Sequence, residues 1–403
     1  MQLSGATKNS GLKLMAAALL APGVTTLRNM PGVRDLDVMM DLLRATGAAV
    51  DRPTPDTVRV DAGGEITPEA PYELVTRMRA SFNVLGPLLA RCGEARVALP
   101  GGDNIGSRKV DMHLRGLEAM GADVEVRHGY VHARTELLHG ARVVLEFPSV
   151  GATENLMCAA VLAKGHTVIE NAAREPEVAD LAAFLDRMGA HVLGAGTSTI
   201  EIDGVEALHA ADSEIMCDRV EAGTLLMACG ITGGEIELTG IRSEHVEMVV
   251  QKLCEMGMRV SPTSDGLWAM GPRRLKAVDV ATLPHPGFAT DFMPLAVALM
   301  TTAEGSAIVT ENVYDGRFQF VDELARMGAD VRTEGRHAIV RGVERLSGAP
   351  VQASDVRAGA ALVLAGLVAD GETIVHGGEH IERGYTDLAA HLRALGADVE
   401  RLD

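Results

Sequence analysis

A chain of 403 residues is longer than one hydrophobic core usually reaches, and 47% of this chain is apolar, so the composition predicts two domains. The formal net charge of −18 excludes nucleic acid as a partner, because the long-range field of the protein would repel it. The longest apolar run, residues 358–369, is too short to span a bilayer, and no signal-peptide core follows Met1. We therefore expect a soluble, cytoplasmic protein without a membrane partner.

The cysteines are spread along the chain without a C-x-x-C pair. They are Cys92, Cys158, Cys217, Cys229 and Cys254. This spacing favours neither a zinc site nor a disulfide framework. We expect reduced thiols, no metal ion and no cofactor, so any anionic ligand would be held by a local cluster of Arg and Lys.

In chain order, the predicted elements repeat six times. Each copy reads as an apolar helix, a Gly turn, a strand, a polar loop, an amphipathic helix, a second Gly turn and a pair of strands, for about 70 residues. The first turn falls at Gly23, Gly93, Gly165, Gly233, Gly305 and Gly371. The second falls at Gly47, Gly121, Gly189, Gly257, Gly328 and Gly396. Gly after a run of helix formers is the expected C-terminal cap of a helix that precedes a strand.

The period of the repeat predicts the architecture. Copies of this length are too long for solenoid repeats and too short for separate domains, so six copies in two domains give three per domain. We predict an α/β fold in which each domain is a pseudo-threefold bundle of βαβαββ-type repeats. The copies place residues 8–216 in one domain and residues 1–7 with 217–403 in the other, joined by a hinge near Ala6 and Cys217.

Unusual polar residues collect in loops that precede helices. Before the apolar helices lie Lys8, Asn9, Arg79, Ser81, Ser149, Thr153, Asp218, Arg219, Glu221, Thr290, Asp291, Asp355 and Arg357. Before the amphipathic helices lie Arg34, Asp35, Asp103, Arg108, Arg174, Glu175, Arg242, Glu244, Arg317 and Arg383. Each residue alone could simply cap its helix or pair with a neighbouring acid. Together, at equivalent places of repeated units, they favour a small polyanionic substrate, because helix N-termini attract phosphate and carboxylate groups.

The run Leu99-Pro-Gly-Gly-Asp-Asn-Ile-Gly-Ser-Arg108 is the least ordinary segment. Its glycines and proline predict a mobile loop, and Asp103 and Arg108 add an acid and an anion-binding fork. It does not match the phosphate-loop motif, and no G-x-G-x-x-G follows a strand, so ATPase and dinucleotide-binding functions are not favoured. We interpret the loop as a lid over an active site.

These segments occur together, in the same order, in one known family. They are Lys8-Asn9, residues 78–81, 100–108 and 110–113, 149–153, 171–177, 218–221, 286–291, 311–317, 355–357 and 380–385. Along essentially its whole length the sequence resembles the UDP-N-acetylglucosamine 1-carboxyvinyltransferases, which are enolpyruvyl transferases. The resemblance implies two inside-out α/β barrel domains of three repeats each, with the active site in the interdomain cleft.

The resemblance also implies an activity and its residues. The enolpyruvyl group of phosphoenolpyruvate would pass to the 3-hydroxyl of UDP-N-acetylglucosamine with release of phosphate, the first committed step of peptidoglycan precursor synthesis. Lys8, Arg108 and Arg383 are expected to hold the phosphate and carboxylate of phosphoenolpyruvate, with Arg79 and Arg357 nearby. Arg317 is expected among the substrate-binding residues. Those expected at the nucleotide sugar are Asn9, Lys109, Val110, Asp111, Met112, Ser149, Val150, Gly151, Asp291 and Val313. Asp291 is the candidate base for the sugar hydroxyl.

Asp103 stands where many members of the family have a cysteine. The resemblance makes it the candidate proton donor to the methylene carbon, but a carboxyl group donates only when protonated, and the nearby Arg108 and Arg79 favour its ionised form. Asp103 would therefore need substrate and lid closure to gain a proton, or would act mainly in the lid. We also hypothesise fosfomycin resistance, because that epoxide alkylates a cysteine thiolate and a carboxylate is a poorer nucleophile.

Three departures from the family keep alternatives open. Compared with the family, the first strand of the second domain is expected to be shortened or absent, and one extra residue precedes Lys8. Phe292-Met293 is expected to alter the acceptor pocket. The first alternative is a paralogue that acts on another uridine nucleotide, for example UMP in nucleoside antibiotic synthesis. The second is a catalytically silent nucleotide-sugar binding protein. The sequence does not indicate an oligomeric state.

Overall fold

The computed structural model describes residues 6–106 and 108–402, and these form two compact units. The first unit comprises residues 6–102 and 109–216, and the second comprises 103–106, 108 and 217–402. The predicted domain boundaries differ from this packing because they assigned loop 103–108 to the first domain and residues 6–7 to the second. As functional domains they stay a prediction. The shortened first strand and residues 1–5 of the predicted second domain lie outside the described residues.

The first unit contains three copies of the repeat. The first copy has α1 (Lys8–Ala17), η1 (Ala18–Leu20), β1 (Val24–Arg28), α2 (Arg34–Ala45), β2 (Ala49–Thr54) and β3 (Thr57–Asp61). The second has β4 (Glu69–Ala70), α3 (Tyr72–Val75), η2 (Arg79–Val84), α4 (Leu85–Cys92), β5 (Glu94–Ala98), α5 (Asp111–Ala119), β6 (Asp123–Arg127) and β7 (Tyr130–Arg134). The third has β8 (Arg142–Val144), α6 (Val150–Ala160), β9 (His166–Glu170), α7 (Pro176–Arg187), β10 (His191–Leu193), β11 (Thr199–Asp203) and β12 (Ser213–Glu214).

The second unit continues the series. It begins with α8 (Arg219–Thr232), β13 (Glu235–Thr239), η3 (Ser243–Val246), α9 (Glu247–Glu255), β14 (Arg259–Pro262) and β15 (Gly266–Met270). It continues with β16 (Val280–Ala281), η4 (Thr290–Phe292), α10 (Met293–Met300), β17 (Ser306–Thr310), α11 (Val321–Arg326), β18 (Asp330–Glu334) and β19 (His337–Arg341). It ends with β20 (Leu346–Ser347), β21 (Pro350–Gln352), α12 (Val356–Gly366), β22 (Ala369–Asp370), β23 (Ile374–His376), α13 (Gly378–Ile381) and α14 (Leu388–Ala394).

Each copy in the first unit contributes to a sheet of the same design. The strand orders are β12-β1-β3-β2, β4-β5-β7-β6 and β10-β11-β9-β8. In each sheet one edge pair is parallel and the other pairs are antiparallel, as in β1, which pairs with β12 in parallel and with β3 in antiparallel register from Val24 opposite Asp61 to Arg28 opposite Thr57. In the second unit β16-β17-β19-β18 repeats this design, whereas β13-β15-β14 has the antiparallel pairs without a parallel edge pair among the described residues.

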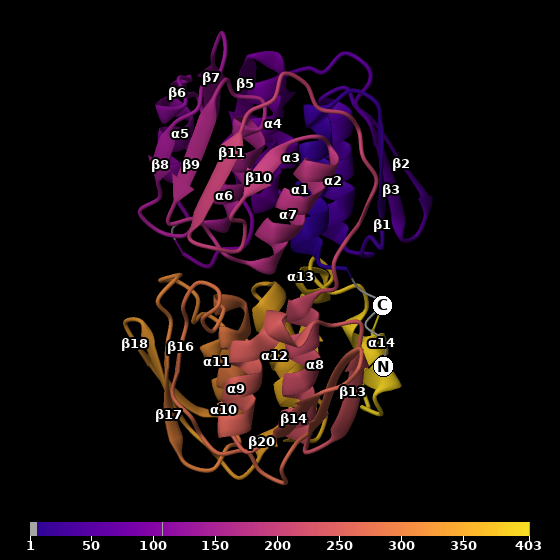
Figure 1. Ribbon diagram of the computed structural model, residues 1–403. Helices are drawn as coiled ribbons and strands as arrows, with labels where there is room; N and C mark the ends of the chain where they lie inside the picture. The colour runs from indigo at the N-terminus through magenta and orange to yellow at the C-terminus, as the bar shows by residue number, and fades with distance from the viewer. Residues whose placement is uncertain (1–5, 107, 403) are drawn as a thin grey trace. The chain divides into compact units, whose positions relative to one another are not determined.

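Within each unit the apolar helices form the centre and the sheets lie outside them (Figure 1). All eight residues of α10 are buried, as are most residues of α6, α8 and α12, because these helices are apolar around their whole circumference. The amphipathic helices, such as α2 and α7, bury one face only. The predicted inside-out α/β fold is confirmed in each unit.

The predicted glycine turns are confirmed at all twelve junctions. Their φ angles lie between 68° and 107°, which is the left-handed region where a Cβ atom is strained. One predicted feature is wrong: in the sixth copy residues 397–402 form no strand. A strand forms only when a neighbour pairs with it, and within the described chain this segment has no strand partner; β23 pairs only with β21 there.

No helix in the described parts of the chain is long and apolar enough to cross a bilayer.

Gly86 allows the closest approach between α4 and α6. A Cβ atom at this position would lie 2.2 Å from the carbonyl oxygen of Asn155. We expect Gly86→Ala to lower the free energy of unfolding by about 1–3 kcal/mol, because the helices must move apart. Denaturant unfolding would measure this, with Gly64→Ala as the control, since a Cβ there meets no atom within 4 Å. Equal effects of the two substitutions would contradict the prediction.

Candidate active site

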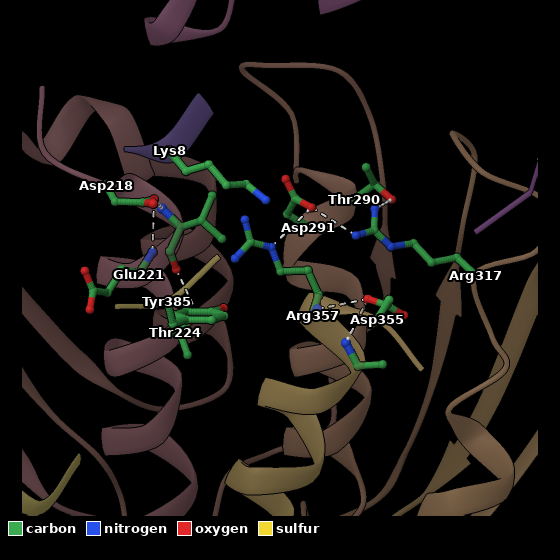
Figure 2. Close-up of polar contacts among 12 residues, drawn as sticks. Lys8, Asp218, Glu221, Thr224, Thr290, Asp291, Arg317, Asp355, Arg357 and Tyr385 are labelled. Carbon is green, nitrogen blue, oxygen red and sulfur yellow. Dashed lines mark hydrogen bonds and ion pairs between the residues drawn. The ribbon is translucent and has the colours of Figure 1, made fainter. Parts of the chain in front are cut away.

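Carboxylates stand at the N-termini of the three central helices of the second unit (Figure 2). Asp218 caps α8 by accepting the N–H groups of Val220 and Glu221 at 2.7 and 3.2 Å. Asp355 caps α12 by accepting from Arg357 and Ala358. These two carboxylates therefore have the structural role that the sequence left open for them.

Asp291, just before α10, lies between two arginines. Its Oδ1 atom is 2.9 Å from Nη2 of Arg317 and 3.4 Å from Nε of Arg357. The two arginine side chains are only 3% and 6% exposed, whereas that of Asp291 is 30% exposed. Figure 2 shows both guanidinium groups directed at the carboxylate from opposite sides. The structure thus brings together three predicted site residues that are far apart in the sequence.

The two arginines retain unused hydrogen-bond donors. Nε of Arg317 and Nη1 of Arg357 are buried and have no hydrogen-bond partner within the described residues. A buried guanidinium N–H without an acceptor is costly, so such groups mark the place where a bound anion would supply oxygen atoms. The cluster carries two positive charges against one negative charge, which also favours an anion.

The arginines control the charge of Asp291. Burial alone would raise the pKa of this carboxyl, but Arg357 and Arg317 outweigh burial and hold the pKa well below its usual range. Asp291 is therefore ionised at neutral pH. It is also a weak base for as long as both guanidinium groups face it.

Two groups position these arginines. Arg357 lies over the ring of Tyr385, 5.2 Å from its centroid, and the Tyr385 hydroxyl is 2.8 Å from that of Thr224. Burial raises the pKa of Tyr385, so the hydroxyl stays protonated. Arg317 donates to the hydroxyl of Thr290 at 2.7 Å. Tyr385 and Thr224 were not among the predicted site residues. Tyr385 lies in segment 380–385, one of the segments that carry the family resemblance, so its sequence position could have indicated it.

A buried glutamate shapes the loop that contains Val313. Glu311 is 1% exposed and accepts the N–H groups of Val313 and Tyr314 at 2.7 and 3.0 Å. Its other oxygen accepts from the Thr290 hydroxyl at 2.7 Å. Glu311 thus connects the Val313 loop to the residue that precedes Asp291.

The glycine-rich loop packs on the second unit. Asp103 forms an ion pair with Arg383, 280 residues away, and its carbonyl oxygen accepts from Arg108 at 2.9 Å. A Cβ atom at Gly106 would lie 2.2 Å from a carboxylate oxygen of Asp315, so only glycine fits there. The candidate proton donor and a candidate phosphoenolpyruvate ligand are therefore direct partners.

The first unit holds the other predicted residues. Lys8 at the start of α1, next to Asn9, pairs with the buried Asp35 of α2 at 2.9 Å. Arg79 donates to the carbonyl oxygen of Lys109 at 3.2 Å, which ties two predicted segments together. Asp35 was noted as a loop residue but was not predicted to be a site residue. Its position in the first turn of α2 could have indicated a role at the site.

The segments predicted to bind the nucleotide sugar begin α5 and α6. Ser149 caps α6 by accepting the N–H of Ala152, and Val150 and Gly151 form the first turn. Asp111 begins α5, after Val110 and before Met112, and pairs with Arg115 at 2.6 Å, where both side chains are about half exposed. Free N–H groups at these helix starts can bind an anionic ligand. The roles of all the predicted site residues stay predictions.

Comparison with known proteins identifies the family. Residues 1–392 match the family described as EPSP synthase (3-phosphoshikimate 1-carboxyvinyltransferase). The chain belongs to this family. It is 51% identical to the UDP-N-acetylglucosamine 1-carboxyvinyltransferase of Nocardia farcinica, over 99% of this chain and 95% of that protein. It is 49% identical to the protein of the same name from Trichlorobacter lovleyi, over 98% of this chain and 94% of that protein.

Solved structures agree with this membership. The enolpyruvyl transferase NikO from Streptomyces tendae matches with a TM-score of 0.88 and 26% identity, over 99% of this chain and 95% of that chain. An EPSP synthase from Acinetobacter baumannii matches with a TM-score of 0.76 and 19% identity, over 98% and 95% of the two chains, which shows a shared fold. The fold of this carboxyvinyltransferase family member is thus that of the enolpyruvyl transferases.

In this family member the last helix, α14, is joined to the start of α8 by a titratable pair. Nδ1 of His391 is 2.5 Å from Oε1 of Glu221, and their side chains are 16% and 5% exposed. The hydrogen bond to Glu221 raises the pKa of His391 against the opposing effect of burial, and the charges of Glu221 and Asp387 add to the increase. The pair therefore stabilises the fold fully below the ordinary pKa of His, about 6.5, and loses its contribution as the pH rises through the raised value.

We expect His391→Gln to cost about 1.5 kcal/mol of unfolding free energy at pH 6, the order of a hydrogen bond to a charged group, and clearly less at pH 9. Urea unfolding at a series of pH values would measure the difference. His337→Gln is the control, because this exposed residue pairs with the hydroxyl of Thr310. A cost for His391→Gln that is constant, or that grows with pH, would contradict the prediction.

Proposed function

We propose that this protein transfers the enolpyruvyl group of phosphoenolpyruvate to the 3-hydroxyl of UDP-N-acetylglucosamine and releases phosphate. The observation that carries the proposal is the Arg317–Asp291–Arg357 cluster, with two buried guanidinium N–H groups that lack partners among the described residues. The acceptor follows from the names of relatives that are about half identical over nearly the whole chain.

The chemistry divides among the predicted residues. The carboxylate and phosphate of phosphoenolpyruvate would bind to Arg and Lys side chains, whose charge stabilises the tetrahedral ketal intermediate. These side chains are Lys8, Arg79, Arg108, Arg317, Arg357 and Arg383. The remaining polar contacts, at Asn9, residues 109–112, residues 149–151 and Val313, would hold the nucleotide sugar.

The addition step needs a base and an acid. We assign the base to Asp291, which would remove the proton of the sugar 3-hydroxyl as that oxygen bonds to the central enol carbon. Substrate oxygens that bind Arg317 and Arg357 would draw these groups away from Asp291 and make it more basic. The acid adds a proton to the methylene carbon. Loss of a proton from the resulting methyl group then restores the double bond as phosphate leaves.

We assign the acid to Asp103. In the structure its partner is Arg383. Phosphoenolpyruvate that binds Arg383 would replace Asp103 in this pair. Asp103 would then be released from Arg383 to act as the donor.

Two alternatives remain candidates for experiment. The first alternative is a paralogue that acts on another uridine nucleotide, and the likeness to the enolpyruvyl transferase NikO is the reason to test it. At 26% identity, NikO is weaker support for this alternative than relatives near 50% identity are for transfer to UDP-N-acetylglucosamine. A catalytically silent binder is not favoured by the unused arginine donors. We further propose that the protein works in the cytoplasm, where its five free cysteines stay reduced, and that it supports cell-wall synthesis, cell shape and division.

Phosphate release from phosphoenolpyruvate tests the function directly. We expect release with UDP-N-acetylglucosamine and much slower release with UMP. Arg317→Ala should lower kcat/KM by about 10²-fold, the usual effect of removing a donor that stabilises transition-state charge. Faster release with UMP would favour the paralogue, and no release with either acceptor would favour the silent binder.

Fosfomycin tests the role of position 103. We expect the natural protein to keep full activity on prolonged incubation, because a carboxylate is a poor nucleophile toward the epoxide, and Asp103→Cys to lose activity with time. The thiols of Cys217 and Cys158 should not react quickly, since burial raises the pKa of Cys217 to about 12 and also that of Cys158. Covalent, time-dependent inactivation of the natural protein would contradict the prediction.

A further inference from the structure

Five polar side chains that were not assigned to the reaction are buried together inside the first unit. They are Lys13 of α1, Asn83 of η2, His113 of α5, and Glu154 and Asn155 of α6. None is more than 8% exposed. Burying this many polar groups is costly unless their hydrogen bonds are made, so the cluster calls for an explanation.

Glu154 connects three helices. Its Oε2 atom forms an ion pair with Lys13 and accepts a hydrogen bond from Nδ2 of Asn83 at 2.9 Å. The second oxygen, Oε1, is buried without a partner in the described chain. The contacts join α1, η2 and α6 at one point.

Asn155 connects the same core to α5. Its Oδ1 atom accepts from the N–H of Gly86 at 2.5 Å, so its Nδ2 group must be the donor toward the carbonyl of Phe82 at 3.2 Å and Nδ1 of His113 at 3.0 Å. His113 therefore accepts at Nδ1 and carries its proton on Nε2. Burial, with smaller contributions from Arg79 and Lys13, lowers the pKa of His113 to about 3, so the ring stays neutral near pH 7.

The ring of His113 supports the start of α6. A Cβ atom at Gly151 would lie 3.3 Å from Cε1 of His113, so the ring packs directly on the first turn of that helix. His113 also follows Met112 at once and meets Phe82 edge-on, with ring centroids 5.1 Å apart. His113 thus adjoins both segments predicted to hold the nucleotide sugar: it follows residues 109–112 in the chain, and its ring packs on residues 149–151.

An apolar core would pack these helices at less cost. Buried ion pairs replaced by apolar groups of similar size often leave a protein equally stable or more stable. Directional hydrogen bonds instead favour one register between helices, and an error of 1 Å in a binding site is enough to weaken it. The network lies directly beneath the predicted binding segments, where a fixed register between the helices would keep the binding residues in place.

We propose that His113 and Asn155 are positioning residues for the uridine nucleotide sugar. They hold the starts of α5 and α6 in register, and Lys13, Asn83 and Glu154 tie this pair of helices to α1 and η2. The inference rests on the proposed function, because it takes the ligand from there.

The test compares the KM values for the two substrates, of which only the KM for UDP-N-acetylglucosamine should change. We expect His113→Phe, which removes the acceptor, to raise the KM for UDP-N-acetylglucosamine about 10-fold or more, the size of effect seen when supporting contacts of a site are lost. The KM for phosphoenolpyruvate and kcat should change less than about twofold. His113→Asn can still accept from Asn155 and should restore binding to near that of the natural protein. Asn155→Ser removes the donor and should reproduce the split if His113→Phe does not fold.

Leu89→Ala is the matched control, because it opens a cavity in the core of the same unit at a side chain that makes none of these hydrogen bonds. The proposal is overturned if the control gives the same split, if both KM values and kcat change together in His113→Phe, or if His113→Asn is as defective as His113→Phe.

Calorimetric titration with UDP-N-acetylglucosamine separates this proposal from the proposed function. If the natural protein binds the nucleotide sugar but releases no phosphate, the function fails, and about 10-fold weaker binding by His113→Phe alone still supports the positioning role. Equal binding by the natural protein, His113→Phe and His113→Asn overturns it. A natural protein that does not bind the nucleotide sugar overturns both.

Discussion

The contact of the Asp291 carboxylate with Arg317 and Arg357 is the interaction on which the candidate site depends. Two nearly buried guanidinium groups would repel each other without a carboxylate between them, and the carboxylate keeps both aimed at one place. The excess positive charge and the unused donors then leave room for one more anion. In a protein with a net charge of −18, only such a local cluster can attract a small polyanion.

The repeat fold explains why such clusters arise at helix starts. The central helices are largely apolar and fill the core of each unit, so their sides carry few polar groups. Most of the candidate site residues therefore lie at their N-terminal ends, where unpaired N–H groups need acceptors. Asp218 and Asp355 satisfy this need by capping, whereas Asp291 is held by arginines instead. A single architectural rule therefore supplies both structural caps and candidate catalytic groups.

Each unit also buries polar contacts in its interior, which costs free energy of folding. The Lys13–Glu154 pair and the Asn155–His113 hydrogen bond in the first unit correspond to the His391–Glu221 pair and the Tyr385–Thr224 hydrogen bond in the second. Buried polar networks favour one arrangement of the helices, which a site for two substrates requires more than it requires the last increment of stability.

The sequence by itself determined the six copies, the twelve glycine turns and the positions of candidate residues at helix starts, because these depend on local conformational preference and on motifs contiguous in the chain. Only the tertiary structure decided the pairing of Asp103 with Arg383, the partners of Asp291, the pairing of Lys8 with Asp35, and the absence of a strand in residues 397–402. Each of these depends on which groups from distant segments reach each other. Spacing along the chain does not predict these contacts, because they depend on how the helices and sheets pack.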